Sequence, residues 1–422
     1  MAGIRFIHTA DLHLDTPFKG LSNLNETLAS ILKNATFQSF RNIIDRCLQE
    51  QVDFLLIAGD IFDSENQSLA AQLKFADELQ RLSDQRIPTY FICGNHDPLS
   101  SWIEGLQLPD NVHRFGSSEV EKIIHYKGDK PLVDIHGISF QNKAVRNDLT
   151  QHYQIKNRTA PVSLALLHGT IGQPGPHENY APFSIENISG KGFDYWALGH
   201  IHKRQIIRKE HPAVVYPGNP QGRDFGETGA KGCYLVETTA DQEPQIKFIS
   251  TQLIRFEEVA IDLTGEDAVN ILPEKIEETI TGLEDYNEHT SYIVRLTLHG
   301  RTPLHDYLNQ GEEISQLLDY LNEDQLNQNP FRWIDSIELK TQPDIDLDQI
   351  KKGADFPAEI LQTIETYEND PERFQQLIGR TETAFNSPQA NRELKTLQEE
   401  EYKTMLEKAK WMLLEQLKNE QQ

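Results

Sequence analysis

Short apolar runs separated by polar loops dominate the first hundred residues of the chain. Residues 4–9, 54–58 and 88–93 are rich in strand-forming side chains, and each run ends at a polar loop. Between them, apolar residues recur at helical spacing over residues 37–48 and 73–82, which predicts connecting helices. Because strand, helix and strand at this spacing need crossover connections, the pattern predicts a sheet with parallel strands.

Later apolar segments have shorter connections, as expected if the sheet becomes mixed or a second sheet packs on it. They lie at residues 132–138, 162–167, 195–198, 214–216 and 233–236. From about residue 252 the pattern changes to three apparent strands separated by acidic helical segments, which predicts a small α+β domain. These strands are expected at residues 256–263, 292–298 and 333–339.

Beyond residue 346 strand patterns end and helical patterns follow at residues 358–367, 371–378 and about 390–417. The last of these carries an apolar stripe at approximate helical spacing, made of Leu394, Leu397, Tyr402, Met405, Leu406, Ala409, Met412, Leu413 and Leu417. The pattern predicts an α/β domain over residues 1–250, a smaller α+β domain over 251–345 and a helical region over 346–422.

Composition narrows the range of functions. The 422 residues include 65 acidic and 40 basic side chains, for a formal net charge of -25, which argues against a protein coated in basic surface for non-specific nucleic-acid binding. A local site where metals meet phosphate stays open. Three widely spaced cysteines fit a reducing cytosol. No apolar run approaches the ~20 residues that cross a bilayer, so we expect a cytoplasmic protein without a membrane segment.

Five polar clusters stand at strand ends and carry the candidate chemistry. They are Asp11-Leu12-His13, Gly59-Asp60, Gly94-Asn95-His96-Asp97, His168-Gly169 and Gly199-His200-Ile201-His202. In an extended segment residues i and i+2 project to the same side, so Asp11 and His13 can approach one metal ion together. Any one cluster alone is more often turn chemistry, because Asn, Asp and Gly are turn residues. All five together, in this order, predict a dinuclear metal site.

The candidate ligands are two carboxylates, one amide and four imidazoles. Mixed oxygen and nitrogen ligands suit Mn, Fe or Zn better than Ca or Mg alone. Pairs of divalent ions are a recurrent solution for phosphoester cleavage, since they hold the phosphate oxygens and activate a water. His96 is then a surplus imidazole, free to protonate the leaving oxygen as a general acid. His8, inside the first strand, is expected to pack in the core.

The motif series DLH, GDIFD, GNHD, LLHG and GHIH resembles the calcineurin-like metallophosphoesterase superfamily. HTADLHLD, AGDIFD and YPGNPQGRDFGETGAKGCYLVE (residues 216–237) are similar to its SbcD-type DNA repair exonuclease branch, and the last segment is most like the bacterial YhaO subgroup. The resemblance implies a two-layered αββα sandwich over about residues 4–240, followed by a capping domain.

The resemblance also implies a role for each cluster. Asp11, His13 and His202 would hold one ion, Asn95, His168 and His200 the other. Asp60 would bridge both, and His96 would be the catalytic acid. Some relatives carry a histidine three residues after the bridging aspartate. This chain has Asp63 there, and Ser64 to Ser68 lacks the Pro-Ser that the SbcD-type pattern favours, so neither feature can be transferred.

The loop Tyr216-Pro217-Gly218-Asn219-Pro220 has two interpretations. Its prolines and glycine make a rigid turn that allows close backbone approach to a ligand. By resemblance, Tyr216, Gly218 and Asn219 border the phosphodiester, with Arg223 as a nearby cation. The alternative is a purely structural turn.

The resemblance implies a DNA exonuclease/endonuclease subunit of an SbcCD-like DNA repair complex, working with two Mn-like ions (Fe, Zn or Mg being alternatives). It would be a homodimer whose C-terminal helices dock on a coiled-coil ABC-type ATPase. The alternative is that their apolar stripe packs within the chain or forms the contact between two copies of it. Two other functions stay open. One is a small-molecule phosphodiesterase or phosphoprotein phosphatase, although such phosphatases typically carry GNHE rather than GNHD. The other is a scaffold subunit.

Overall fold

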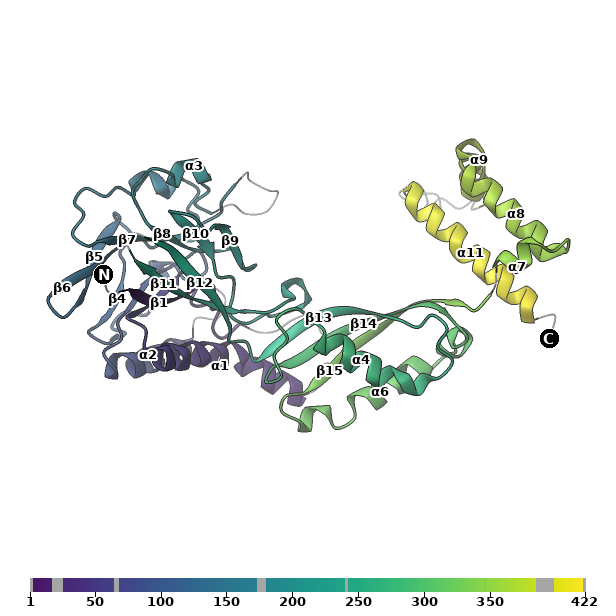
Figure 1. Cartoon of the computed structure of the whole chain (residues 1–422), viewed down its shortest axis with the longest axis horizontal. Coiled ribbons are helices and arrows are strands. Elements are labelled where there is room, and N and C mark those ends of the chain that lie inside the picture. Colours follow the sequence, from purple (N-terminus) through teal and green to yellow (C-terminus); the bar gives the residue numbers. More distant parts are fainter. Residues whose placement is uncertain are drawn as a thin grey trace. The chain divides into compact units, whose positions relative to one another are not determined.

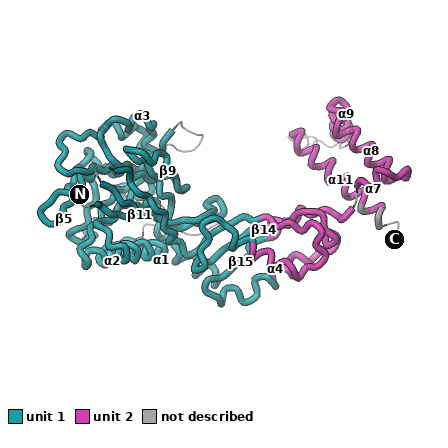
Figure 2. The backbone as a smooth tube through the Cα atoms, viewed as in Figure 1, with its two compact units in different colours: residues 1–259, 279–295, 320–336 teal, residues 260–278, 296–319, 337–422 magenta. Residues whose placement is uncertain are grey.

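The computed structural model describes residues 3–16, 26–63, 68–172, 180–239, 242–345, 347–384 and 398–419. The chain forms two compact units (Figure 2). The first comprises residues 1–259, 279–295 and 320–336, and the second comprises residues 260–278, 296–319 and 337–422. The predicted domain limits at 250 and 345 stay a prediction.

The first unit contains two six-stranded sheets (Figure 1). One has the order β12-β11-β1-β2-β3-β4, with β1 (Ile4–Thr9), β2 (Phe54–Ala58), β3 (Thr89–Ile92), β4 (Val112–Arg114), β11 (Gly232–Thr239) and β12 (Gln242–Ser250). Strands β1 to β4 run parallel, while β11 is antiparallel to β1 and β12 to β11. The helices α1 (Glu26–Glu50) and α2 (Leu69–Asp84) make the crossovers, as the hydrophobic pattern predicts.

The second sheet has the order β5-β6-β7-β8-β10-β9. Its strands are β5 (Glu121–Lys127), β6 (Lys130–Gly137), β7 (Val162–His168), β8 (Tyr195–Gly199), β9 (Gln205–Arg208) and β10 (Ala213–Tyr216). Strands β6, β7, β8 and β10 are parallel, and the two edge strands are antiparallel to their neighbours. The short helix α3 (Ile185–Ile188) lies on this side of the unit.

Strand β2 shows how the layers are held together. All five of its residues are buried. Phe54 and Leu56 face the second sheet, where they pack in one cluster with Leu164 and Leu166 of β7. The alternate residues of β2 face α1 and α2 in another cluster. A strand with both faces covered reads as a continuous apolar run, and each fully buried aliphatic or aromatic side chain stabilises the fold by ~1.5–3 kcal/mol. The layering is therefore αββα, which confirms the predicted fold class.

A three-stranded sheet of β13 (Ile254–Asp262), β14 (Ser291–Thr302) and β15 (Arg332–Pro343) follows. Its associated helices are α4 (Leu272–Thr281), α5 (His305–Leu308) and α6 (Glu313–Asn322). Within the first unit, Phe256 and Ile293 pack against Leu28 and Leu32 of α1. This contact explains why α1 begins at Glu26, eleven residues before the helical pattern of the sequence becomes clear.

The C-terminal part of the second unit is helical. It contains α7 (Leu347–Lys351), α8 (Phe356–Asn369), α9 (Pro371–Ala384) and α11 (Glu399–Asn419). Trp411 and Leu414 of α11 pack with Leu361 of α8 and with Ile345. The predicted helical start at 390–397, with Leu394 and Leu397, lies outside the described residues.

Single 3₁₀ turns complete the described secondary structure: η1 (Leu99–Ser101), η2 (Leu149–His152), η3 (Phe225–Glu227), η4 (Val269–Ile271) and η5 (Gln325–Asn327). Within the described ranges, none of the helices combines the length and apolar character that a membrane span requires.

Candidate metal centre

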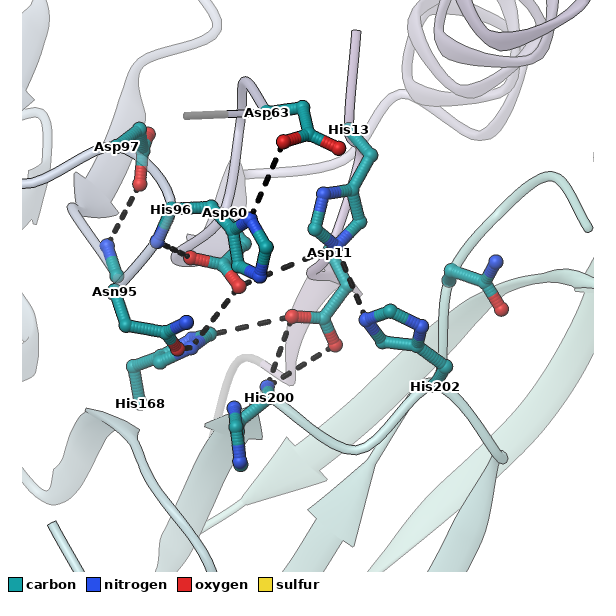
Figure 3. A network of polar contacts seen from close by, with 12 residues as sticks. Asp11, His13, Asp60, Asp63, Asn95, His96, Asp97, His168, His200 and His202 are labelled. Carbon is teal, nitrogen blue, oxygen red and sulfur yellow. Dashed lines mark hydrogen bonds and ion pairs between the residues drawn. The ribbon is translucent and has the colours of Figure 1, made fainter. Parts of the chain in front are cut away.

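All five predicted clusters meet at the carboxyl ends of β1, β2, β3, β7 and β8 (Figure 3). The pairing of β1 with β2 continues past the strands, because the Asp11 amide donates to Gly59 O at 3.0 Å and the His13 amide to Asp60 O at 3.1 Å. Asp11, His13 and Asp60 all have positive φ angles of 45–53°. A left-handed backbone conformation at a non-glycine residue costs energy, and residues in this conformation are found more often at functional sites. The strand ends are thus shaped to turn these side chains inward.

One group of candidate ligands consists of Asp11, His13 and His202, whose ligand atoms lie within 4.8 Å of one another. The His13 Nε2 and His202 Nε2 atoms are 3.0 Å apart. Asp11 is fully buried, and its carboxylate accepts the backbone N–H of His200 through both oxygens, at 2.9 and 3.1 Å. The fifth cluster therefore holds the carboxylate of the first in place.

The second group consists of Asp60, His168 and His200, again within 4.8 Å. Asn95 Oδ1 lies 2.9 Å from His168 Nε2 and joins them. The other ring nitrogen of His168, Nδ1, lies 2.9 Å from the Ala58 carbonyl oxygen and donates its proton there. This bond leaves the Nε2 lone pair of a neutral His168 for a metal, an arrangement common among metal-binding histidines.

Asp60 stands between the two groups. Its Oδ2 lies 3.3 Å from His168 Nε2 and 4.0 Å from His13 Nε2. Burial would raise the pKa of Asp60, but neighbouring imidazoles, His168 first, hold it well below its ordinary value. Burial would likewise lower the pKa of His168, but Asp60 and Asp11 outweigh it and raise that pKa to about 9. Asp60 thus lies within reach of both groups, and its role as a bridging ligand stays a prediction.

The charges of this cluster fit divalent cations. Asp11 and Asp60 are at most 1% exposed, and among the described residues neither forms an ion pair with a lysine or arginine. Buried carboxylates need a cation or strong hydrogen bonds to remain charged. Carboxylate, amide and imidazole ligands suit transition metals such as Mn, Fe or Zn.

His96 lies at the exposed side of the cluster. Its backbone N–H donates to Asp60 Oδ1 at 2.8 Å, while its side chain is 32% exposed and its Nδ1 lies 3.4 Å from Asp63 Oδ1. Burial lowers the pKa of His96, but the carboxylates of Asp63 and Asp60 outweigh it and raise the pKa above its ordinary value. A protonated imidazole beside the ligands, open to solvent, can act as a general acid.

Asp97 ties two of the ligand loops together. Its Oδ1 accepts the Gly94 amide at 2.8 Å and its Oδ2 accepts the Ile61 amide at 3.1 Å. Burial, then the nearby charge of Asp60, raises the pKa of Asp97 to about 8. The sequence places Asp97 in a cluster but gives no sign that its side chain reaches the loop that follows Asp60.

The loop after β10 is packed into the structure rather than open. Tyr216 is fully buried, and its hydroxyl donates to Gly169 O at 2.7 Å and accepts from Ile171 N at 3.1 Å. A Cβ on Gly218 would lie 2.6 Å from His202 O, so only glycine allows this approach to the metal-binding loop. Asn219 is 1% exposed. These contacts support the loop that bears His202, and a direct role in substrate binding stays a prediction.

Arg223 and Glu227 form an ion pair beside His202. The Arg223 side chain is 18% exposed, its Nη2 lies 2.7 Å from Glu227 Oε1, and its Nη1 lies 3.9 Å from Asp63 Oδ2. Burial would raise the pKa of Glu227, but His202 and Arg223 hold it well below its ordinary value. Sequence reasoning missed Glu227, because nothing in its spacing ties it to a histidine 25 residues earlier.

Residues 4–204 match the family model for calcineurin-like phosphoesterases, and residues 256–342 match that for the middle domain of metallophosphoesterase YhaO. The chain is 37% identical over 349 residues to a Bacillus subtilis protein named uncharacterized metallophosphoesterase YhaO, covering 82% of this chain and 84% of that protein.

More distant similarity extends to several proteins with nuclease or repair names. The chain is 24% identical over 347 residues to the DNA double-strand break repair protein Mre11 of Sulfolobus acidocaldarius, covering 80% of this chain and 86% of that protein. It is 27% identical over 274 residues to one of the subunits of the nuclease SbcCD from Bacillus subtilis, covering 57% of this chain and 68% of that protein. With the family match and the extensive identity to YhaO, the chain belongs to the calcineurin-like metallophosphoesterases, a family whose fold implies divalent metal ions.

Proposed function

We propose that this metallophosphoesterase hydrolyses DNA phosphodiester bonds with two divalent ions, Mn in preference to Fe, Zn or Mg. Asp11, His13 and His202 would hold one ion, Asn95, His168 and His200 would hold the other, and Asp60 would be shared by both. The observation that carries the proposal is the position of Asp60, whose Oδ2 lies between His168 Nε2 at 3.3 Å and His13 Nε2 at 4.0 Å.

Bound ions supply Lewis acidity and an activated water for phosphoester cleavage. The chain itself contributes the proton that the leaving oxygen needs. His96 carries that proton, and Asp63 keeps the imidazole protonated from a distance of 3.4 Å. Arg223, at the edge of the site, offers a guanidinium to a phosphate oxygen.

DNA is favoured over a small substrate by the names of the relatives and by the architecture. Distant relatives are named as DNA break repair proteins and as a nuclease subunit. The chain also carries more than 160 residues after residue 250, beyond what a small-nucleotide enzyme needs. A net charge of -25 predicts weak binding of DNA by the chain alone. A partner is therefore expected to supply much of the DNA affinity.

The test is a set of cleavage assays on the purified full chain loaded with Mn. Substrates are labelled single-stranded DNA, double-stranded DNA and bis-nitrophenyl phosphate, and each is tested with the wild type, His96→Ala and the control His289→Ala, whose side chain is 84% exposed. We expect both DNA forms or one of them to be cut, His289→Ala to behave as wild type, and His96→Ala to lose ~10²–10⁴-fold in kcat. The loss should be larger on DNA, since an alkoxide needs protonation more than nitrophenolate does.

Three outcomes would contradict parts of this proposal. Cleavage of bis-nitrophenyl phosphate without cleavage of either DNA form would favour a small-molecule phosphodiesterase. Unchanged DNA cleavage by His96→Ala would show that His96 is not the general acid. A metal-loaded chain inert towards every phosphoester would favour a scaffold subunit.

We also propose that the chain dimerises and that its C-terminal helices dock on a coiled-coil ABC-type ATPase. On α11, Met405, Met412 and Leu413 are 43–62% exposed, whereas Trp411 and Leu414 are buried in the second unit. Of the stripe predicted from the sequence, Tyr402 is buried, whereas Met405, Met412 and Leu413 are exposed; Trp411 and Leu414, which pack in the second unit, lie outside that predicted stripe. Co-elution with a coiled-coil fragment of such an ATPase, lost in Met412→Glu but retained in His289→Ala, would support docking. Light scattering would give the mass of the free chain.

A further inference from the structure

Glu227 is the centre of a hydrogen-bonded group beside His202. It ends the 3₁₀ turn Phe225–Glu227, and its side chain is 11% exposed. Its Oε1 lies 2.7 Å from His202 Nδ1 and accepts Arg223 Nη2 at 2.7 Å. Its Oε2 accepts Asn219 Nδ2 at 2.8 Å and the Arg223 amide at 2.9 Å. With a fifth contact, from Arg223 Nε to Oε2 at 3.2 Å, these hydrogen bonds fix the carboxylate and point one oxygen at the imidazole.

The two charged neighbours of His202 Nδ1 favour opposite positions for the imidazole proton. A carboxylate only accepts hydrogen bonds, so Glu227 favours a proton on Nδ1. A guanidinium only donates, and Arg223 Nη2 lies 3.2 Å from the same Nδ1, so Arg223 favours a bare Nδ1 and a proton on Nε2. Nε2 is the atom that faces His13 Nε2 at 3.0 Å. A neutral imidazole can bind a metal through Nε2 only when its proton is on Nδ1.

Glu227 prevails over Arg223 on distance. Its Oε1 is closer to Nδ1 than Arg223 Nη2 is, at 2.7 against 3.2 Å, and it also engages that same Nη2. We propose that Glu227 is a positioning residue that holds the His202 proton on Nδ1 and so keeps Nε2 available for a divalent cation. The inference rests on the proposed role of His202 as a metal ligand.

Separate hydrogen bonds hold the backbone of His202. Lys231 Nζ donates to His202 O at 3.0 Å, and the Asn219 amide donates to the same oxygen at 3.2 Å. Lys231 holds this carbonyl without a hydrogen bond to the Glu227 carboxylate, and the Asn219 side chain also donates to Gln221 O at 2.7 Å, so Asn219 keeps a second anchor when Glu227 is lost. Loss of Glu227 should therefore change the proton position and rotation of the ring more than the path of the loop.

The experiment titrates the metal-stripped full chain with Mn by calorimetry and compares wild type with Glu227→Ala, Glu227→Ala/Arg223→Ala and His202→Ala. Glu257→Ala is the matched control, since Glu257 is also a buried glutamate paired with an arginine, Arg255. We expect Glu227→Ala to weaken one of the two ions by ~10–100-fold, the usual effect of losing such a partner. The double variant should recover part of that loss, because the competing donor is gone.

The proton position is measured directly by nitrogen-15 spectra of histidine-labelled protein, with His202→Ala identifying the signal. We expect a protonated Nδ1 in the wild type and a protonated Nε2 in Glu227→Ala. Binding of both ions with wild-type affinity in Glu227→Ala, while His202→Ala loses one, would overturn the inference and leave the ligand assignment intact. A loss matched by Glu257→Ala, with no recovery in the double variant, would also overturn it. Retention of both ions by His202→Ala would instead refute the proposed ligand set.

Discussion

Replacing Gly94 with alanine would place a methyl group inside the metal-binding cluster. A Cβ at this position would lie 2.2 Å from Asp60 Oδ1, 2.8 Å from His168 Cε1 and 2.9 Å from Asp60 Cγ. Ordinary contacts between such atoms are roughly 3.5 Å, so the Asp60 carboxylate and the His168 ring must each give way by about 1 Å. Asp60 Oδ1 also holds the His96 amide at 2.8 Å, so the displacement reaches the proposed general acid.

The size of the expected loss in rate and stability follows from these displacements. A misplacement of about 1 Å in a catalytic group can cost ~10²-fold in rate, which corresponds to ~2.7 kcal/mol in the barrier. Overpacking of a rigid site costs a further ~1–3 kcal/mol in stability. We therefore expect Gly94→Ala to remain folded, to bind at least one ion more weakly, and to lose about two orders of magnitude in kcat.

The assay measures kcat for bis-nitrophenyl phosphate and Mn binding by calorimetry, with circular dichroism to show that the variant is folded. Gly3→Ala is the control, because its Cβ would meet only Thr239 Cγ2 at 3.9 Å. A Gly94→Ala variant with kcat within twofold of wild type and two ions at unchanged affinity would refute the placement of Asp60 and His168 described above.

Three further predictions follow from contacts and pKa shifts. Asp63→Asn removes the carboxylate that raises the pKa of His96. The alkaline limb of the pH profile of kcat on DNA should therefore move to lower pH. An unchanged alkaline limb would show that Asp63 does not set the pKa of the general acid. Burial lowers the pKa of His8 from 6.5 to about 3, so the unfolded chain takes up this proton first and stability should fall as pH drops below 6.5, by up to ~1.4 kcal/mol per pH unit. Chemical unfolding measured at several pH values should show that the free energy of unfolding of His8→Gln depends less steeply on pH than that of the wild type. An equal pH dependence would contradict the lowered pKa of His8. Mn at 100 times its Kd should stabilise the folded chain by ~2.7 kcal/mol and raise Tm by several degrees; Asp60→Asn should abolish this shift, and an equal shift in that variant would place the ion elsewhere.

The local sequence was enough to predict the strands that are buried on both faces. The runs at 4–9 and 54–58 are strands β1 and β2 with the predicted bounds. β2 is apolar throughout because both of its faces are covered. The edge strands β5 and β9 escaped prediction, since their exposed and half-buried residues break the apolar pattern. The N-terminal part of α1 escaped as well, because it is stabilised by residues more than 200 positions later in the chain.

The candidate site likewise combines residues that the sequence indicated with contacts that only the structure revealed. The sequence alone indicated which strand ends carry carboxylates and imidazoles, since parallel strands bring their carboxyl ends to one edge and the motifs follow them directly. Only the tertiary structure placed Asp63 against His96, Asp97 across two loops and Glu227 against His202. These partners are set by hydrogen bonds between segments that are far apart in the sequence, and such bonds leave no periodic signal in it. The candidate ligands could therefore be predicted from the sequence, whereas the groups that contact and orient the site residues were decided by tertiary packing.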